Sequence, residues 1–218
     1  MQHPTIVVVT AGGPPAVRPR ELPLGAAVIA ADGGVDRALS LGLHVDLAIG
    51  DLDSVTTKGL QAAEAAGARV ERHPAEKDAT DLELALDAAV ALGPARIVVV
   101  GSDGGRLDHL LGSLLLLADG RYAGPRIEAW LGAAHVDVIR GSLRLDGRPG
   151  DVVSLIPVHG DAEGVTTEGL VYPLSGETLT AGTSRGTSNL FSAAEAAVTV
   201  LRGCLLAVRP GPERGGSS

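Results

Sequence analysis

The first part of the chain alternates short β-branched runs with Ala- and Leu-rich stretches, and this alternation constrains the fold more than any other feature. The stretches 57–66 and 81–92 place apolar residues at helical spacing, and a further helix is expected over 107–118. The run 97–100 is apolar on both faces, as a strand between two helix layers must be. The pattern predicts a parallel α/β sheet with strands at 5–10, 27–31, 47–49, 69–72, 96–100 and 126–131.

The second part of the chain has a different pattern. Short strands are expected at 136–139, 142–145, 152–157 and 164–168, separated by Gly, Pro and Asp, and helical spacing is absent until close to the end of the chain. This spacing is typical of a small antiparallel sandwich or barrel. We therefore expect a first domain over 1–133, a second over 134–210 and a flexible tail over 211–218.

Composition and charge exclude several classes of function. Aromatic residues make up 2% of the chain, and the net charge is -8, so neither stacking of bases nor attraction to a polyanion is expected. The single cysteine, Cys204, lies in an apolar run and is expected to be a buried structural residue. With no apolar run near the ~20 residues of a bilayer span, and no signal peptide, we expect a cytoplasmic protein without nucleic-acid or membrane partners.

Acidic residues follow four consecutive predicted strands, each at the carboxyl end of its strand. Ligands of open parallel sheets bind outside these ends, so the acids are expected to meet at one edge. Asp next to Gly is also ordinary turn chemistry, and Asp78 or Thr80 could simply cap the helix that follows. A turn does not need two aspartates around an apolar residue, as in Asp51-Leu52-Asp53. The acids concerned are Asp32, Asp51, Asp53, Asp78, Asp81, Asp103 and Asp108.

Crowded carboxylates repel one another unless a cation lies between them, which gives this edge its chemistry. Oxygen ligands without matching His or Cys favour Mg²⁺ or Mn²⁺ over zinc, and magnesium takes substrate phosphates as further ligands. Glycines beside the acids, including Gly33, Gly34 and Gly104, allow backbone amides to approach phosphate oxygens. Lys77 and Arg106 are the cations available to hold those oxygens.

Several familiar sites are missing from the sequence. There is no Gly-x-x-x-x-Gly-Lys-Ser/Thr loop, no Gly-x-Gly-x-x-Gly after the first strand and no Gly-x-Ser-x-Gly. The six histidines show no metal-ligand spacing. A P-loop enzyme, a dinucleotide-binding fold and an α/β-hydrolase are therefore disfavoured.

The motifs, taken together and in order, resemble the thiamine pyrophosphokinase (thiamine diphosphokinase) family over nearly the whole chain. The matching segments are Ala31-Asp32-Gly33-Gly34, Ile49-Gly50-Asp51-Leu52-Asp53-Ser54, Lys77-Asp78-Ala79-Thr80-Asp81-Leu82, Gly101-Ser102-Asp103-Gly104-Gly105-Arg106-Leu107-Asp108-His109, Val153-Ser154-Leu155-Ile156-Pro157, Thr167-Glu168-Gly169-Leu170-Val171-Tyr172-Pro173-Leu174 and Gly186-Thr187-Ser188-Asn189.

The resemblance implies a Rossmann-like nucleotide-binding domain followed by an antiparallel β-sandwich, which would bind thiamine and form a homodimer with active sites between subunits. It implies transfer of pyrophosphate from Mg·ATP to the hydroxyl of thiamine, with release of AMP. Asp51, Asp53, Asp81 and Arg106 match the catalytic residues, and Asp32 and Asp78 would be further metal ligands. The nucleotide would meet Gly33, Gly34, Lys77, Asp78, Thr80, Ser102, Asp103, Gly104, Arg106, Asp108 and His109, and the substrate would meet Asp32, Ser188 and Asn189.

Some questions stay open at this level. Family members often stack an aromatic ring on thiamine, and here Trp130, Tyr172 and Phe191 are the candidates. Which aspartate accepts the proton of the attacking alcohol is not determined. A metal-dependent nucleotide-sugar transferase is the alternative enzyme, because Asp-x-Asp also holds a metal and a diphosphate there. A thiamine- or nucleotide-binding protein without activity is the other alternative.

Overall fold

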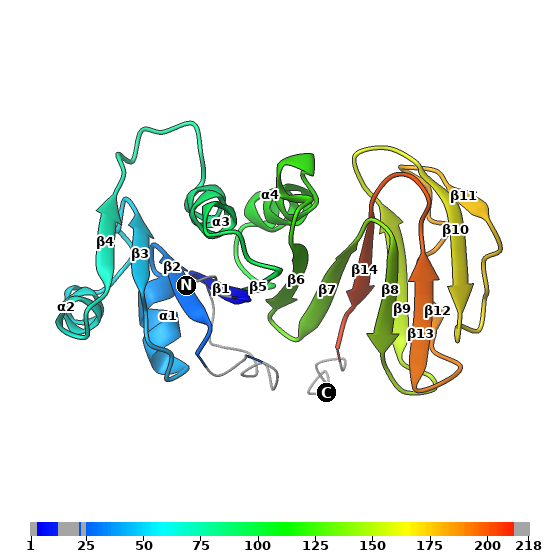
Figure 1. The fold of residues 1–218 in the computed structure, drawn as a ribbon, viewed down its shortest axis with the longest axis horizontal. Helices are drawn as coiled ribbons and strands as arrows, with labels where there is room; N and C mark the ends of the chain where they lie inside the picture. Colours follow the sequence, from blue (N-terminus) through cyan, green and yellow to red (C-terminus); the bar gives the residue numbers. More distant parts are fainter. Residues whose placement is uncertain (1–3, 13–21, 23–24, 212–218) are drawn as a thin grey trace, which may run out of the picture. The chain divides into compact units, whose positions relative to one another are not determined.

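The computed structural model describes residues 4–12, 22 and 25–211, and these form two compact units. Unit 1 comprises Met1–Leu116 and Gly124–Gly132, and unit 2 comprises Leu117–Ala123 and Ala133–Ser218 (Figure 1). Most of the predicted tail, 212–218, lies outside the described residues. None of the helices in the described ranges is long and apolar enough to cross a membrane.

The described residues of unit 1 form six parallel strands in the order β6-β5-β1-β2-β3-β4. The prediction of parallel strands in this part of the chain is confirmed, with β3 and β5 each one residue longer than expected. The strands are β1 (Thr5–Thr10), β2 (Ala27–Ala31), β3 (Leu47–Gly50), β4 (Arg69–Arg72), β5 (Arg96–Gly101) and β6 (Arg126–Leu131). The helices are α1 (Gly34–Ser40), α2 (Thr57–Ala65), α3 (Asp81–Ala91) and α4 (Leu107–Leu117).

The inner strands of unit 1 are buried along both faces, which explains their unbroken apolar runs. Every residue of β2 is buried, and Val7, Val28 and Val98 belong to one hydrophobic cluster. Trp130 packs against this cluster. Threonine side chains begin two of the helices: Thr56 accepts a hydrogen bond from Gly59 N, and Thr80 accepts one from Glu83 N.

Unit 2 is built from antiparallel strands in two sets, β12-β9-β14-β7 and β11-β10-β13-β8. Both sets contribute to one hydrophobic cluster, which includes Leu145, Val153 and Val165. The elements are β7 (Ala134–Ile139), β8 (Ser142–Asp146), β9 (Val152–Pro157), β10 (Ala162–Glu168), β11 (Glu177–Leu179), β12 (Asn189–Leu190), β13 (Glu195–Thr199), β14 (Leu205–Arg209) and the short 3₁₀ helix η1 (Gly120–Tyr122).

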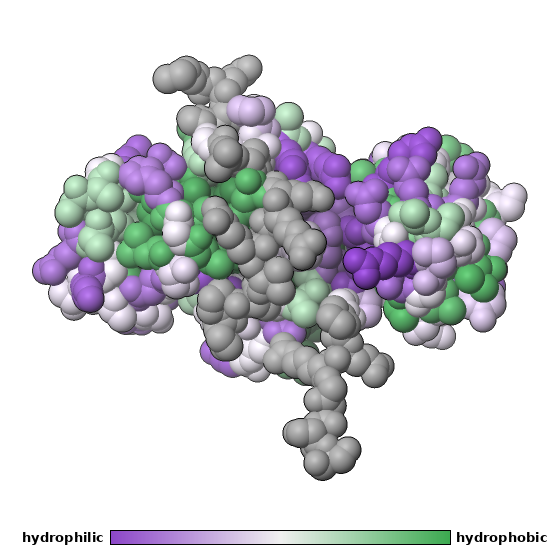
Figure 2. Space-filling view, turned by 90° about the horizontal axis from the view of Figure 1, so that it is seen from below, coloured by the Kyte–Doolittle hydropathy of each residue, from purple (hydrophilic) through white to green (hydrophobic). Residues whose placement is uncertain are grey.

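The segment close to the end of the chain differs from the sequence expectation. The apolar run close to the end of the chain contains β14 and no helix, because β14 pairs with both β7 and β9 and its Leu205, Leu206 and Ala207 are buried on both faces. Hydrophilic and hydrophobic residues are mixed over the face of unit 2 seen in Figure 2, as expected of strands with one face in a core. The overall class is mixed α/β, with parallel strands in unit 1 and antiparallel strands in unit 2.

Candidate active site

Three predicted acids meet at the carboxyl ends of two neighbouring strands. Asp32 follows β2, and Asp51 and Asp53 follow β3, which pairs with β2. One carboxylate oxygen from each of the three lies within 4.8 Å of the other two. The edge that the sequence singled out therefore carries a cluster of three carboxylates.

Local backbone geometry brings these carboxylates together. Asp32 and Leu52 both have left-handed backbone conformations, with φ of 47° and 60°. Leu52 is buried, so the residue between Asp51 and Asp53 anchors the loop while the two aspartates flank it. Asp32 Oδ1 accepts a hydrogen bond from Ser54 N at 3.1 Å, which ties the loop after β3 to the end of β2. Left-handed residues other than glycine cost free energy and concentrate at functional sites.

Lys77 connects the cluster to Asp81, the first residue of α3. Its Nζ lies 3.4 Å from Asp51 Oδ2 and 2.7 Å from Asp81 Oδ1. Asp81 Oδ1 is buried, and its contact with Lys77 is an ion pair outside good hydrogen-bond geometry. Burial lowers the pKa of the Lys77 ammonium, but Asp81 and Asp51 outweigh this effect, so its pKa is raised overall.

Gly50 explains how Asp81 can come so close to the cluster. A Cβ atom at this position would lie 2.7 Å from Asp81 Oδ1, and the backbone has a φ of +134°. Only glycine leaves room for the carboxylate against the backbone that precedes Asp51. Gly50 was not among the predicted site residues; its place directly before Asp51 was the available signal.

The remaining acids of this segment have different surroundings. Asp78 is exposed and is not part of the three-carboxylate group. Thr80 is the N-cap of α3, so the capping role considered from the sequence is present. Gly34 is required for packing as well, because a Cβ there would lie 2.1 Å from Val9 O.

The loop after β5 carries a second charged pair. Arg106 donates two hydrogen bonds to Asp108, from Nε at 3.2 Å and from Nη2 at 2.5 Å, and both side chains are exposed. The hydrogen bond from Arg106 lowers the pKa of Asp108 to about 2. His109 is exposed on the first turn of α4. Arg106 is thus paired locally in this structure.

Two other predicted residues of this loop, Ser102 and Asp103, lie against the backbone of glycines. Ser102 Oγ accepts a hydrogen bond from Gly104 N at 3.1 Å. Asp103 lies against Gly132, where a Cβ would come within 2.2 Å of its carboxylate. Burial lowers the pKa of the Arg37 guanidinium, and the charge of Asp103 opposes this change.

Ser188 and Asn189 lie in unit 2, where Asn189 contacts Tyr172. Asn189 is buried; its Oδ1 accepts from Tyr172 N at 3.0 Å and its Nδ2 donates to Tyr172 O at 2.8 Å. Ser188 is exposed, has a φ of 55°, and donates its N–H to Ser154 Oγ at 3.0 Å. Asn189 therefore fixes the backbone that presents Tyr172.

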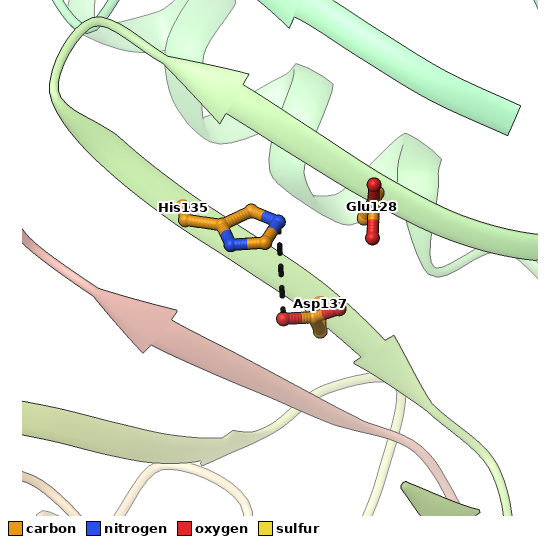
Figure 3. Close-up of side chains that lie close together, drawn as sticks. All are labelled: Glu128, His135 and Asp137. Atoms are coloured by element: carbon orange, nitrogen blue, oxygen red, sulfur yellow. Dashed lines mark ion pairs between the residues drawn. The ribbon is translucent and has the colours of Figure 1, made fainter. Parts of the chain in front are cut away.

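Buried charges elsewhere were not predicted from the sequence. In unit 2, Asp137 is fully buried and pairs with Arg209 at 2.5 Å, while His135 Nε2 lies 4.0 Å from Asp137 Oδ2 (Figure 3). In unit 1, Glu128 pairs with Arg126 at 3.1 Å and also with Arg96. Alternating polar residues within β6 and β7 were the only signal, and it does not distinguish buried ion pairs from exposed ones.

Comparisons with known proteins add independent findings. Residues 24–129 match the family "Thiamin pyrophosphokinase, catalytic domain", and residues 141–205 match "Thiamin pyrophosphokinase, vitamin B1 binding domain". A protein of Bacillus subtilis (strain 168), named thiamine pyrophosphokinase, is 31% identical over 183 residues, which are 83% of this chain and 86% of that protein.

Solved structures give the same result. The crystal structure of thiamine pyrophosphokinase from Bacillus subtilis is similar with a TM-score of 0.83 and 28% identity, covering 95% of this chain and 99% of that one. That of thiamin pyrophosphokinase from Geobacillus thermodenitrificans has a TM-score of 0.77 and 29% identity, covering 96% and 99%.

Proposed function

The chain belongs to the thiamin pyrophosphokinase family, and from this membership we propose that it transfers the pyrophosphoryl group of ATP to the hydroxyl of thiamine. The products are thiamine diphosphate and AMP. The observation that carries the proposal is the cluster of Asp32, Asp51 and Asp53 at the carboxyl edge of the parallel strands. The family assignment covers both halves of the chain, and the cluster lies within the segment matched by the catalytic domain.

The cluster suits a divalent cation. Its donors are carboxylate oxygens that come within 4.8 Å of one another, and this is the ligand chemistry of a hard ion. We propose that the cation is Mg²⁺, or Mn²⁺ in its place. Its ligands would be Asp32, Asp51, Asp53 and Asp81, with Asp78 as an outer, water-mediated ligand. When bound, the cation neutralises the negative charge that develops on the transferred group.

The chain's own residues position the reactants. The thiamine hydroxyl oxygen forms a bond to the β-phosphorus, the bond from that phosphorus to the oxygen shared with the α-phosphate breaks, and AMP leaves. The hydroxyl proton passes to an aspartate among Asp51, Asp53 and Asp81. In this account the carboxylates serve both as metal ligands and as proton acceptor.

We assign the nucleotide to the edge of unit 1, whose parallel strands and intervening helices support the description of this unit as Rossmann-like. Lys77 and Arg106 are the cations that hold phosphoryl oxygens. Arg106 is exposed and pairs with a neighbouring surface carboxylate, and such an exposed pair is a weak constraint. The other proposed nucleotide contacts are Gly33, Gly34, Asp78, Thr80, Ser102, Asp103, Gly104, Asp108 and His109.

We assign thiamine to unit 2, whose two strand sets and common core support the description as a β-sandwich. Of the aromatic candidates, Phe191 is 1% exposed and Trp130 packs in unit 1, whereas Tyr172 is 63% exposed. Tyr172 is therefore the ring that we propose to stack on thiamine. Asn189 holds the backbone of Tyr172 with two hydrogen bonds. The neighbouring segment is held as well, because Val171 N donates a hydrogen bond to Leu190 O. Ser188 is exposed two residues before Leu190.

An apolar stripe on α4 supports the proposed homodimer. Leu107, Leu111 and Leu115 recur every four residues on the helix and are 77%, 56% and 39% exposed. Such a row of leucines is typical of a surface that contacts a partner. Because α4 begins directly after Arg106, a second copy on this stripe would lie beside the proposed nucleotide loop.

The proposed function is tested by incubating the protein with ATP, thiamine and Mg²⁺ and measuring AMP and thiamine diphosphate. We expect the two products in equal amounts, and AMP only when thiamine is present. Turnover of a sugar nucleotide in place of ATP would indicate the transferase alternative. Thermal stabilisation by ATP or thiamine without products would indicate a binding protein.

A further inference from the structure

Lys77 occupies the space between two carboxylates that come from different parts of unit 1. Asp51 follows β3 and Asp81 begins α3, and the Lys77 ammonium lies 3.4 Å from the first and 2.7 Å from the second. The Lys77 side chain is only 15% exposed. Lysine side chains normally extend into solvent, but that of Lys77 is inserted among the acids.

We propose that Lys77 is an exchangeable cation: its ammonium and a divalent metal ion alternate in the space between Asp51 and Asp81, and the metal releases Lys77 toward the phosphoryl oxygens of ATP. This inference rests on the proposed function, since it assigns a role to a residue of the same site. In the reaction Lys77 is a positioning residue.

Because Asp51 and Asp81 repel each other, a positive charge between them is electrostatically favourable. Asp51 also belongs to the three-carboxylate group, so the negative charges of Asp32 and Asp53 repel its own. An ammonium at hydrogen-bond distance balances part of that charge. A divalent ion bound by Asp51 and Asp81 would stand next to the ammonium and repel it, so the two cations exclude each other from this space.

The chain allows Lys77 to move without the acids moving. The segment before Lys77 is tied to Gly50 by the hydrogen bond from His73 N to Gly50 O, at 2.8 Å, and the segment after it is held by the Thr80 cap of α3. Asp81 is held against Gly50. The Lys77 ammonium is carried by a flexible stem of four carbons, so it can turn toward a new partner while the backbone stays in place.

The exchange would give the enzyme two properties. The acids stay assembled before a metal arrives, because Lys77 keeps them from repelling one another. Entry of the metal then sends a positive charge toward the triphosphate, so metal binding and phosphate binding are coupled through one side chain. A fixed structural ion pair would keep the acids assembled but would not couple metal binding to phosphate binding.

The sequence makes the exchange directly observable, because Lys58 and Lys77 are the only lysines of the chain. Protein labelled with ¹³C at lysine Cε gives two sets of signals in a proton–carbon NMR spectrum, assigned with Lys77→Met and Lys58→Met. Lys58 is exposed on α2 and serves as an internal reference. The probe is Mg²⁺ alone, and AMP production from ATP and thiamine is measured on the same preparation over the same Mg²⁺ range.

We expect the two Cε protons of Lys77 to be distinct and broad without Mg²⁺, and to become equivalent and sharp as Mg²⁺ binds, with no change at Lys58. Mn²⁺ binding followed by electron paramagnetic resonance should tighten by about tenfold or more in Lys77→Met and stay unchanged in Lys58→Met. Lys77 signals that stay distinct and broad at Mg²⁺ concentrations that saturate turnover would overturn the exchange and leave the proposed function standing. No AMP production at any Mg²⁺ concentration would overturn the proposed function, and this inference with it.

Discussion

Replacing Gly50 with alanine perturbs the junction between Asp81 and the three-carboxylate cluster without removing a charge. The new Cβ would lie 2.7 Å from Asp81 Oδ1, whereas ordinary contact begins at 3.4 Å, so the carboxylate has to move by about 0.7 Å. The left-handed backbone, with φ at +134°, adds strain of about 1–3 kcal/mol. Misplacement of a catalytic group by about 1 Å can cost on the order of 10²-fold in rate.

We therefore expect Gly50→Ala to lower the free energy of unfolding by about 1–3 kcal/mol and to lower kcat roughly 10- to 100-fold per folded molecule. Gly67→Ala is the matched control, because Gly67 has a φ of +100° and no atom of the described residues lies within 4 Å of its Cβ position. It should lose comparable stability and keep its kcat. Urea unfolding and AMP production measure the two quantities. Equal kcat in the two variants would refute the conclusion that Asp81 works at this junction.

Three further predictions follow from the exposed residues. The pKa of Asp108, about 2 in the wild type, should rise toward its ordinary value in Arg106→Met, and an NMR titration of the carboxyl carbon measures this pKa. Because the pKa is lowered in the folded state, the stability that this pair contributes is complete above about pH 4 and is lost as the pH falls toward 2. Leu111→Glu should convert a dimer into monomers in light scattering, whereas Leu92→Glu, which also changes an exposed leucine, should not. Tyr172→Ala should raise the KM for thiamine roughly tenfold with little change in the KM for ATP, as expected for loss of about 1–1.5 kcal/mol of stacking, and Tyr172→Phe should restore it.

The parallel strands could be predicted from the sequence because the inner ones, such as β2 and β5, are buried on both faces and the longer helices keep regular apolar spacing. β14 escaped prediction for a related reason. As an inner strand between β7 and β9 it has no polar face, so its run of apolar residues does not show the alternation of a strand. The helix α1 has only seven residues, too few for its spacing to be recognised.

The candidate site was partly predictable. Asp32, Asp51 and Asp53 follow neighbouring parallel strands, so topology alone brings them to one edge. The contact of Lys77 with Asp51 and Asp81 depends on how the segment between β4 and α3 folds back, which neither spacing nor propensity determines. Tyr172 could not be distinguished from Phe191 in the sequence, because their difference in exposure arises only when the strands of unit 2 share a core.

Diffraction from crystals grown with Mn²⁺ and a non-hydrolysable ATP analogue would show whether the carboxylate cluster holds the metal, because the anomalous signal of manganese locates the ion. We expect an anomalous peak coordinated by the carboxylates of Asp51 and Asp53 and by phosphate oxygens of the analogue. A bound analogue whose metal lies away from both aspartates would contradict it.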